Sequence, residues 1–118
     1  GICGACTILF NNEPVRSCLM LAPQIDNGEI TTIEGISENS SYNDLREAFK
    51  KYHALQCGYC TPGFLTTIVY LLEKKQYLSD EEIRKKLSGN ICRCTGYTGI
   101  IKAVKEVMAN RFKRSIND

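Results

Sequence analysis

Cysteine is the residue type in this chain whose number and spacing could do chemistry. The 118 residues include seven cysteines and one histidine. An odd number of cysteines argues against a secreted disulfide scaffold, and grouped intracellular thiols more often bind metal. We therefore expect a metal-binding protein in a reducing compartment, the cytoplasm. The cysteines form two groups, which are Cys3, Cys6 and Cys18, and then Cys57, Cys60, Cys92 and Cys94.

The second group consists of a C-x-x-C pair, Cys57 and Cys60, and a C-x-C pair, Cys92 and Cys94. Each pair comes just before a predicted helix, where unpaired backbone N–H groups and the helix dipole favour negative charge and lower thiol pKa values. If the two helix starts meet, the four thiolates converge on one point. An iron–sulfur cluster with four cysteine ligands fits this arrangement. A zinc ion bound by four thiolates is the structural alternative.

The first group consists of a C-x-x-C pair, Cys3 and Cys6, and the more distant Cys18. This spacing matches the later part of the plant-type ferredoxin pattern, C-x4-C-x2-C followed by a remote cysteine. The first cysteine of that pattern would lie upstream of Gly1. The small residue Gly4 leaves room for the backbone to wrap a cluster. The ordinary alternative for Cys18 is a buried cysteine that behaves as a small apolar residue.

Short strands are predicted in the first third of the chain. The β-branched and apolar runs 7–10 and 15–17 are separated by the turn-forming segment 11–14, which predicts a hairpin. A third strand is expected at 30–34, and Gly35 ends it.

Helices are predicted in the rest of the chain. The polar segment 37–40 is the expected boundary between one domain at residues 1–36 and a second at residues 41–118. Four segments of the second domain have apolar residues at the spacing of one helical face, which predicts a four-helix bundle and an α+β fold overall. The predicted caps of the first three helices are Ser41, Thr61 and Ser79. The predicted buried stripes are Leu45, Ala48, Phe49 and Tyr52; Leu65, Ile68, Val69 and Leu72; Ile83 and Leu87; and Ile100, Ala103, Val104 and Val107.

Composition argues against several other functions. The net charge is only +2, so no broad basic surface indicates a nucleic-acid partner. The longest apolar run, residues 64–72, is far shorter than the roughly 20 residues of a membrane-spanning helix. We find no Ser-His-Asp set, no paired acid and base carboxylates and no phosphate-binding glycine loop. We therefore expect no catalytic residue for substrate chemistry on this chain.

Four motifs together resemble the small iron–sulfur subunit of the xanthine dehydrogenase family of molybdenum hydroxylases. They are CGACT at 3–7, TIEG at 32–35, QCGYCTPG at 56–63 and GNICRCTGY at 89–97. Their order and spacing match over nearly the whole chain. The resemblance implies a partial β-grasp ferredoxin-like domain with one [2Fe-2S] cluster, followed by a four-helix domain with a second.

The resemblance also implies roles for single residues and for partners. By position, Gln56 and Cys94 match residues that contact the pterin in the family. A large partner subunit would carry the molybdenum-pterin cofactor and another subunit would carry FAD, with electrons passing from molybdenum through the helical cluster and then the ferredoxin-type cluster to FAD. The family's opening strands, first helix and fourth ligand of the first cluster have no match here, so we expect a longer natural subunit. The implied ligands are Cys3, Cys6 and Cys18 for the first cluster and Cys57, Cys60, Cys92 and Cys94 for the second.

Overall fold

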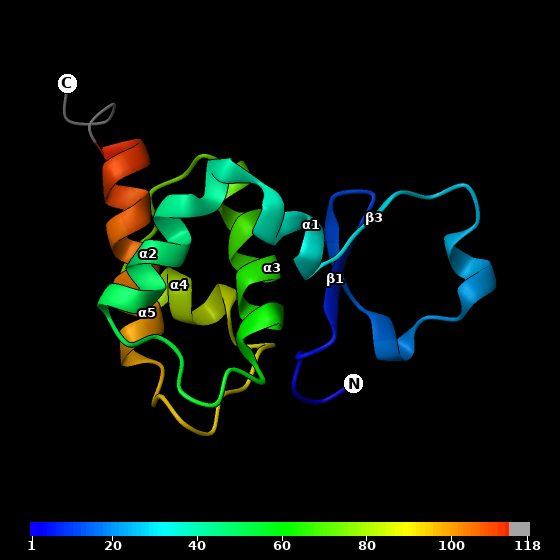
Figure 1. The fold of residues 1–118 in the computed structure, drawn as a ribbon, viewed down its shortest axis with the longest axis horizontal. Coiled ribbons are helices and arrows are strands. Elements are labelled where there is room, and N and C mark those ends of the chain that lie inside the picture. Colours follow the sequence, from blue (N-terminus) through cyan, green and yellow to red (C-terminus); the bar gives the residue numbers. More distant parts are fainter. Residues whose placement is uncertain (114–118) are drawn as a thin grey trace.

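A computed structural model describes residues 1–113, and it places a small β-sheet beside a group of helices (Figure 1). The hairpin predicted from the sequence is present as β1 (Thr7–Phe10) and β2 (Glu13–Arg16), which pair antiparallel. The short strand β3 (Ile30–Thr31) pairs antiparallel with the other edge of β1, so the sheet order is β2-β1-β3. The long connection between β2 and β3 contains two 3-10 turns, at Ser17–Leu19 and Ala22–Ile25.

Five α-helices follow in the described part of the chain. A 3-10 turn at Ser40–Tyr42 precedes the second of them, and a π-helical turn at Ala109–Lys113 extends the last. Residues 114–118 of the predicted helical domain lie outside the described residues. The helices are α1 (Ile33–Glu38), α2 (Asn43–Lys51), α3 (Thr61–Glu73), α4 (Asp80–Lys86) and α5 (Thr98–Met108).

Helix α3 is the central element, with the sheet on one side and the other long helices on the opposite side (Figure 1). It is therefore buried on most of its circumference and not only along the predicted stripe. Thr66 and Thr67 are buried polar residues of this helix. Their hydroxyls donate to the carbonyls of Pro62 and Gly63, at 2.8 and 3.0 Å. These bonds satisfy the polar atoms that burial would otherwise leave without partners.

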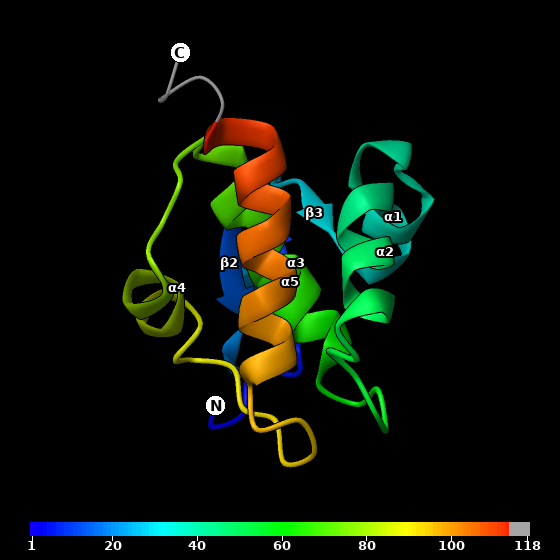
Figure 2. The same cartoon turned by 90° about the vertical axis from the view of Figure 1, so that its left-hand side faces the viewer.

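The outer helices bury the faces that the sequence predicts. Helix α5 packs against both α2 and α4, and Figure 2 shows α5 between them. The capping box of α4 is confirmed, because Ser79 Oγ accepts from the N–H of Glu82 at 3.2 Å and the Glu82 carboxylate accepts from the N–H of Ser79 at 2.8 Å. The predicted residues found buried are Leu45, Ala48, Phe49, Ile68, Val69, Leu72, Ile83, Leu87, Ile100, Ala103, Val104 and Val107.

The prediction of a strand at 30–34 is wrong beyond Thr31. Helix α1 begins at Ile33 and buries Ile36 in the helical core, against α3. Apolar contact with α3 therefore replaces further pairing with β1. The division into domains at 1–36 and 41–118 stays a prediction.

Two predicted helix caps are also wrong. Ser41 lies inside the 3-10 turn that precedes α2, and the side chain of Asn39 accepts from its N–H at 2.9 Å. Thr61 is the first residue of α3, and Cys60 stands at the cap position. The hydroxyl of Thr61 makes no capping bond. The cysteine therefore occupies the place where the orphan N–H groups of α3 concentrate positive potential.

The first turn of α3 presses against the loop that carries Cys3 and Cys6. A Cβ atom added to Gly63 would lie 2.2 Å from the carbonyl oxygen of Gly4 and 3.0 Å from the Cα of Ala5. Both are backbone atoms that cannot rotate away. Only glycine permits this close approach between the helix and the loop.

We predict that Gly63→Ala lowers the free energy of unfolding by about 1–3 kcal/mol, because the added methyl overpacks a backbone contact. Gly35→Ala is the matched control in α1, where the added Cβ would meet only Thr31 Cγ2 at 3.5 Å. The control should gain about 0.5–1 kcal/mol from the reduced freedom of the unfolded chain. Urea unfolding of both variants tests this, and equal stabilities would contradict the close approach.

Candidate metal centres

The two cysteine groups lie at the same end of the molecule. The loops 52–60 and 89–97, which carry the second group, form the lower end of the structure in both views, and the start of the chain lies beside them (Figures 1 and 2). Each loop of the second group leads into a long helix, α3 or α5. The two loops therefore share one end of the molecule, while the convergence of the four thiolates on one point stays a prediction.

Cys60 and Cys92 form the inner pair of the second group. Cys92 is only 8% exposed and its thiol contacts that of Cys60, which is partly buried. Cys57 is close enough to interact electrostatically with Cys60, while Cys57 and Cys94 are exposed to solvent. Gln56 ties the two loops together, because its Nε2 donates to the carbonyl of Cys94 at 3.1 Å.

The inner thiols have opposite electrostatic surroundings. Burial raises the pKa of Cys60 to about 12, and the neighbouring Cys92 and Cys57 contribute to the rise. Burial also disfavours the thiolate of Cys92, but hydrogen bonds from Thr95 hold the pKa of that thiol below its ordinary value. Without a cation, Cys60 therefore keeps its proton at neutral pH. A bound metal centre would allow both sulfurs to ionise.

The first group also comes together in space. Cys3, Cys6 and Cys18 line one cavity of about 270 Å³. A hydrogen bond from the backbone of Cys18 lowers the pKa of Cys6. Tyr59, which stands between the cysteines of the second group's C-x-x-C, is 80% exposed and lines the same cavity. The two cysteine groups are therefore direct neighbours.

Asn90 fastens the two cysteine-bearing loops to each other. It is only 3% exposed, and its Nδ2 donates to the carbonyl of Gly4 at 3.1 Å. The N–H of the next residue, Ile91, donates to the carbonyl of Cys3 at 2.8 Å. The backbone that leads into Cys92 is thus one hydrogen bond away from Cys3.

The model of the [2Fe-2S] binding domain family matches residues 32–105. The chain is 51% identical over 110 residues to the caffeine dehydrogenase subunit gamma of Pseudomonas sp. (strain CBB1), a match that covers 91% of this chain and 66% of that protein. It is 42% identical over 106 residues to the xanthine dehydrogenase iron-sulfur-binding subunit of Escherichia coli O157:H7, covering 88% of this chain and 67% of that protein. The chain belongs to the [2Fe-2S]-binding iron–sulfur subunits of the molybdenum hydroxylase family.

A solved structure supports this family assignment. The quinoline 2-oxidoreductase of Pseudomonas putida 86 matches with a TM-score of 0.87 and 45% identity, over 97% of this chain and 71% of that chain. The α+β fold class and the family resemblance predicted from the sequence are therefore confirmed. The chain spans about two thirds of the length of the caffeine and xanthine dehydrogenase subunits.

The residues of the second group fit the [2Fe-2S] cluster of this family. Gly58 and Gly96 have φ values of +81° and +65°, and no atom beyond their chain neighbours lies within 4 Å of an added Cβ, so space is open beside each cysteine pair. The buried hydroxyl of Thr61, directly after Cys60, has no partner among the described residues, and a cluster sulfur would supply an acceptor.

The geometry also bears on the choice between a cluster and zinc. Within residues 1–113, no three His, Cys, Asp or Glu side chains lie close enough to share one metal ion. A [2Fe-2S] cluster distributes its four cysteines over two irons, so it does not require such a compact set. The family match selects the iron–sulfur cluster over the zinc alternative.

Sequence reasoning missed the polar residues that support the cysteines. Thr95 donates its hydroxyl to Cys92 Sγ at 3.2 Å, and Asn90 joins the loops. Both stand within or beside the C-x-C motif, which was the available signal. The predicted pterin contacts of Gln56 and Cys94 stay predictions. Among residues 1–113, none of the helices has the length and apolarity needed to span a bilayer.

We predict that Asn90→Ala destabilises the chain by about 1–3 kcal/mol, because it removes the buried hydrogen bonds that join Asn90 to the carbonyl of Gly4 and to the hydroxyl of Thr67. The exposed Asn110, in the last helical turn, supplies the control variant Asn110→Ala. Urea unfolding should show a lower midpoint for the first variant alone. If both midpoints equal that of the wild type, Asn90 does not hold the loops together.

Proposed function

We propose that this chain is the electron-transfer subunit of a molybdenum-pterin hydroxylase or dehydrogenase. It relays electrons from the molybdenum site of a large partner subunit through two [2Fe-2S] clusters to FAD on a further partner. The observation that carries this proposal is the close approach of the two cysteine-bearing loops, which the 2.8 Å hydrogen bond from the N–H of Ile91 to the carbonyl of Cys3 joins directly. Electron transfer needs such short, well-packed connections, whereas a purely structural metal site does not.

In this proposal the four cysteines of the second group hold the helical cluster, and Cys3, Cys6 and Cys18 are three ligands of the other. When bound, each cluster accepts and passes on one electron at a time. The chain's own residues fix where the electron resides. The start of α3 immediately follows Cys60, so its dipole offsets the negative charge of the second cluster without a buried cation.

The exposed cysteine-bearing end is the surface that we assign to the molybdenum-pterin subunit. Cys57 and Cys94 are exposed there, and so are the apolar side chains of Leu55 and Ile91. Exposed apolar residues that gather in one place mark protein contacts. Gln56 and Cys94 are the residues that we propose to lie against the pterin.

We also propose that the complex is cytoplasmic. None of the seven cysteines, all of which lie within the described residues, is paired in a disulfide. Unpaired thiols in this number are typical of a reducing compartment. The dehydrogenases and oxidoreductases among the relatives are named for different substrates, and the substrate-binding residues of this complex belong, in our proposal, to the large partner.

We predict that Cys94→Ala in the assembled complex abolishes the helical cluster and stops electron flow to FAD. Substrate should still reduce molybdenum once, because that reaction takes place on the partner subunit. Single-turnover and steady-state assays of the same preparation separate the two steps. Ser88→Ala, at an exposed serine outside both cysteine pairs, is the control and should turn over normally. Normal steady-state turnover by the Cys94 variant would refute the relay.

A further inference from the structure

The hydroxyl of Thr95 is aimed at the most buried cysteine. Its Oγ1 lies 3.2 Å from Cys92 Sγ. The same oxygen accepts the N–H of Tyr97 at 3.2 Å. The hydroxyl of Thr95 thus accepts one hydrogen bond, from Tyr97, and uses its proton to donate the other, to Cys92 Sγ. Cys92 is only 8% exposed, so little water competes for its sulfur, which the backbone N–H groups of Cys94 and Thr95 also approach.

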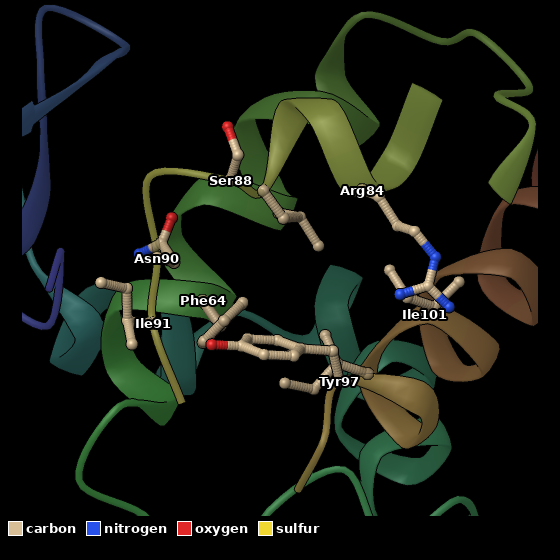
Figure 3. Close-up of a pocket in the computed structure, with 9 residues that line it drawn as sticks. Phe64, Arg84, Ser88, Asn90, Ile91, Tyr97 and Ile101 are labelled. Carbon is tan, nitrogen blue, oxygen red and sulfur yellow. The ribbon is translucent and has the colours of Figure 1, made fainter. Parts of the chain in front are cut away.

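Tyr97 holds this arrangement in place. Its phenol oxygen accepts the backbone N–H of Cys92 at 3.1 Å, so Cys92, Thr95 and Tyr97 form a closed ring of hydrogen bonds. Figure 3 shows the ring of Tyr97 extended across a cavity of about 210 Å³, with its hydroxyl pointing toward the side where Ile91 lies.

The backbone of Tyr97 adopts a conformation that non-glycine residues rarely take. Its φ is +71°, in the left-handed region. Such a conformation persists when the surrounding bonds require it, and it occurs often at functional sites. The bonds from Tyr97 to Cys92 and Thr95 are the interactions that this turn makes possible.

We propose that Thr95 raises the reduction potential of the helical cluster by donating a hydrogen bond to the thiolate of Cys92. This inference rests on the function proposed above. The electron that reduces the cluster adds negative charge to its sulfur ligands, and a hydrogen bond to a more negative acceptor is stronger. The bond therefore stabilises the reduced cluster more than the oxidised one, and hydrogen bonds to sulfur are a recognised determinant of cluster potentials.

The test is an EPR-monitored redox titration of the complete complex with Thr95→Val, which removes the hydroxyl and keeps the side-chain shape. At a fixed solution potential, we expect the ratio of reduced to oxidised helical cluster to fall about tenfold, equal to about 59 mV for one electron. Thr95→Ser should restore the wild-type potential. The exposed Thr98, three residues further on, supplies the control Thr98→Val, which should leave the potential unchanged.

A second readout separates tuning from a purely structural role of Thr95. Valine also removes the acceptor for the N–H of Tyr97, so the variant could lose iron by loosening the loop. ENDOR spectra recorded before and after transfer to D2O should show an exchangeable proton coupled to the helical cluster in the wild type and in Thr95→Ser. Thr95→Ala should lack this coupling and titrate like the valine variant.

Two results overturn the inference. One is an equal potential for Thr95→Val and the wild type at full iron content. The other is a potential of Thr95→Ser that falls as far as that of the valine variant, because the loss would then not depend on the hydroxyl. If the wild-type complex gave no [2Fe-2S] signal, that result would instead contradict the proposed function, on which this inference rests.

Discussion

Two neighbouring thiols that are partly shielded from water cannot both ionise unless positive charge lies beside them. The thiols of Cys60 and Cys92 are such neighbours, and burial raises the pKa of Cys60 to about 12. Cys60 stands at the N-cap of the central helix α3, where the orphan N–H groups of the first turn favour negative charge. A metal centre is the change that makes both sulfurs stable as thiolates. The remaining features of this end of the molecule can be understood as ways of holding that centre.

Those features also join the second cysteine group to the first. Gly63 allows the start of α3 to touch the loop around Gly4, and Asn90 fastens that loop to the C-x-C segment. Arg16, from β2, adds a bond to the carbonyl of Gly89 at 2.9 Å. These bonds join the sheet and its preceding loop to the helical part of the chain beside the cysteines. In our proposal this is what keeps two clusters at a constant separation.

The sequence predicted the elements whose signal is local. The capping box of α4 and the buried face of α5 follow from residue types at fixed spacing, and so do the hairpin and the cysteine pairs. Sequence reasoning did not find α1, because its few residues carry one buried side chain, Ile36, and contact with α3 decides its conformation. The C-x-C motif marks the segment that holds Asn90 and Thr95, but it does not give the partners of their side chains. Each depends on a partner that folding brings near. The partner of Asn90 is the carbonyl of Gly4, which is distant in sequence, and the partner of Thr95 is the sulfur of Cys92.

In our proposal the four cysteines of the second group hold a [2Fe-2S] cluster, and metal analysis tests this most directly. Iron, zinc and acid-labile sulfide should be measured in the purified complex, in the wild type and in Cys92→Ala. We expect iron and sulfide in equal amounts, a visible absorption that bleaches on reduction, and the loss of one cluster's iron and sulfide in the variant. Stoichiometric zinc without sulfide, or an unchanged iron and sulfide content in Cys92→Ala, would contradict it.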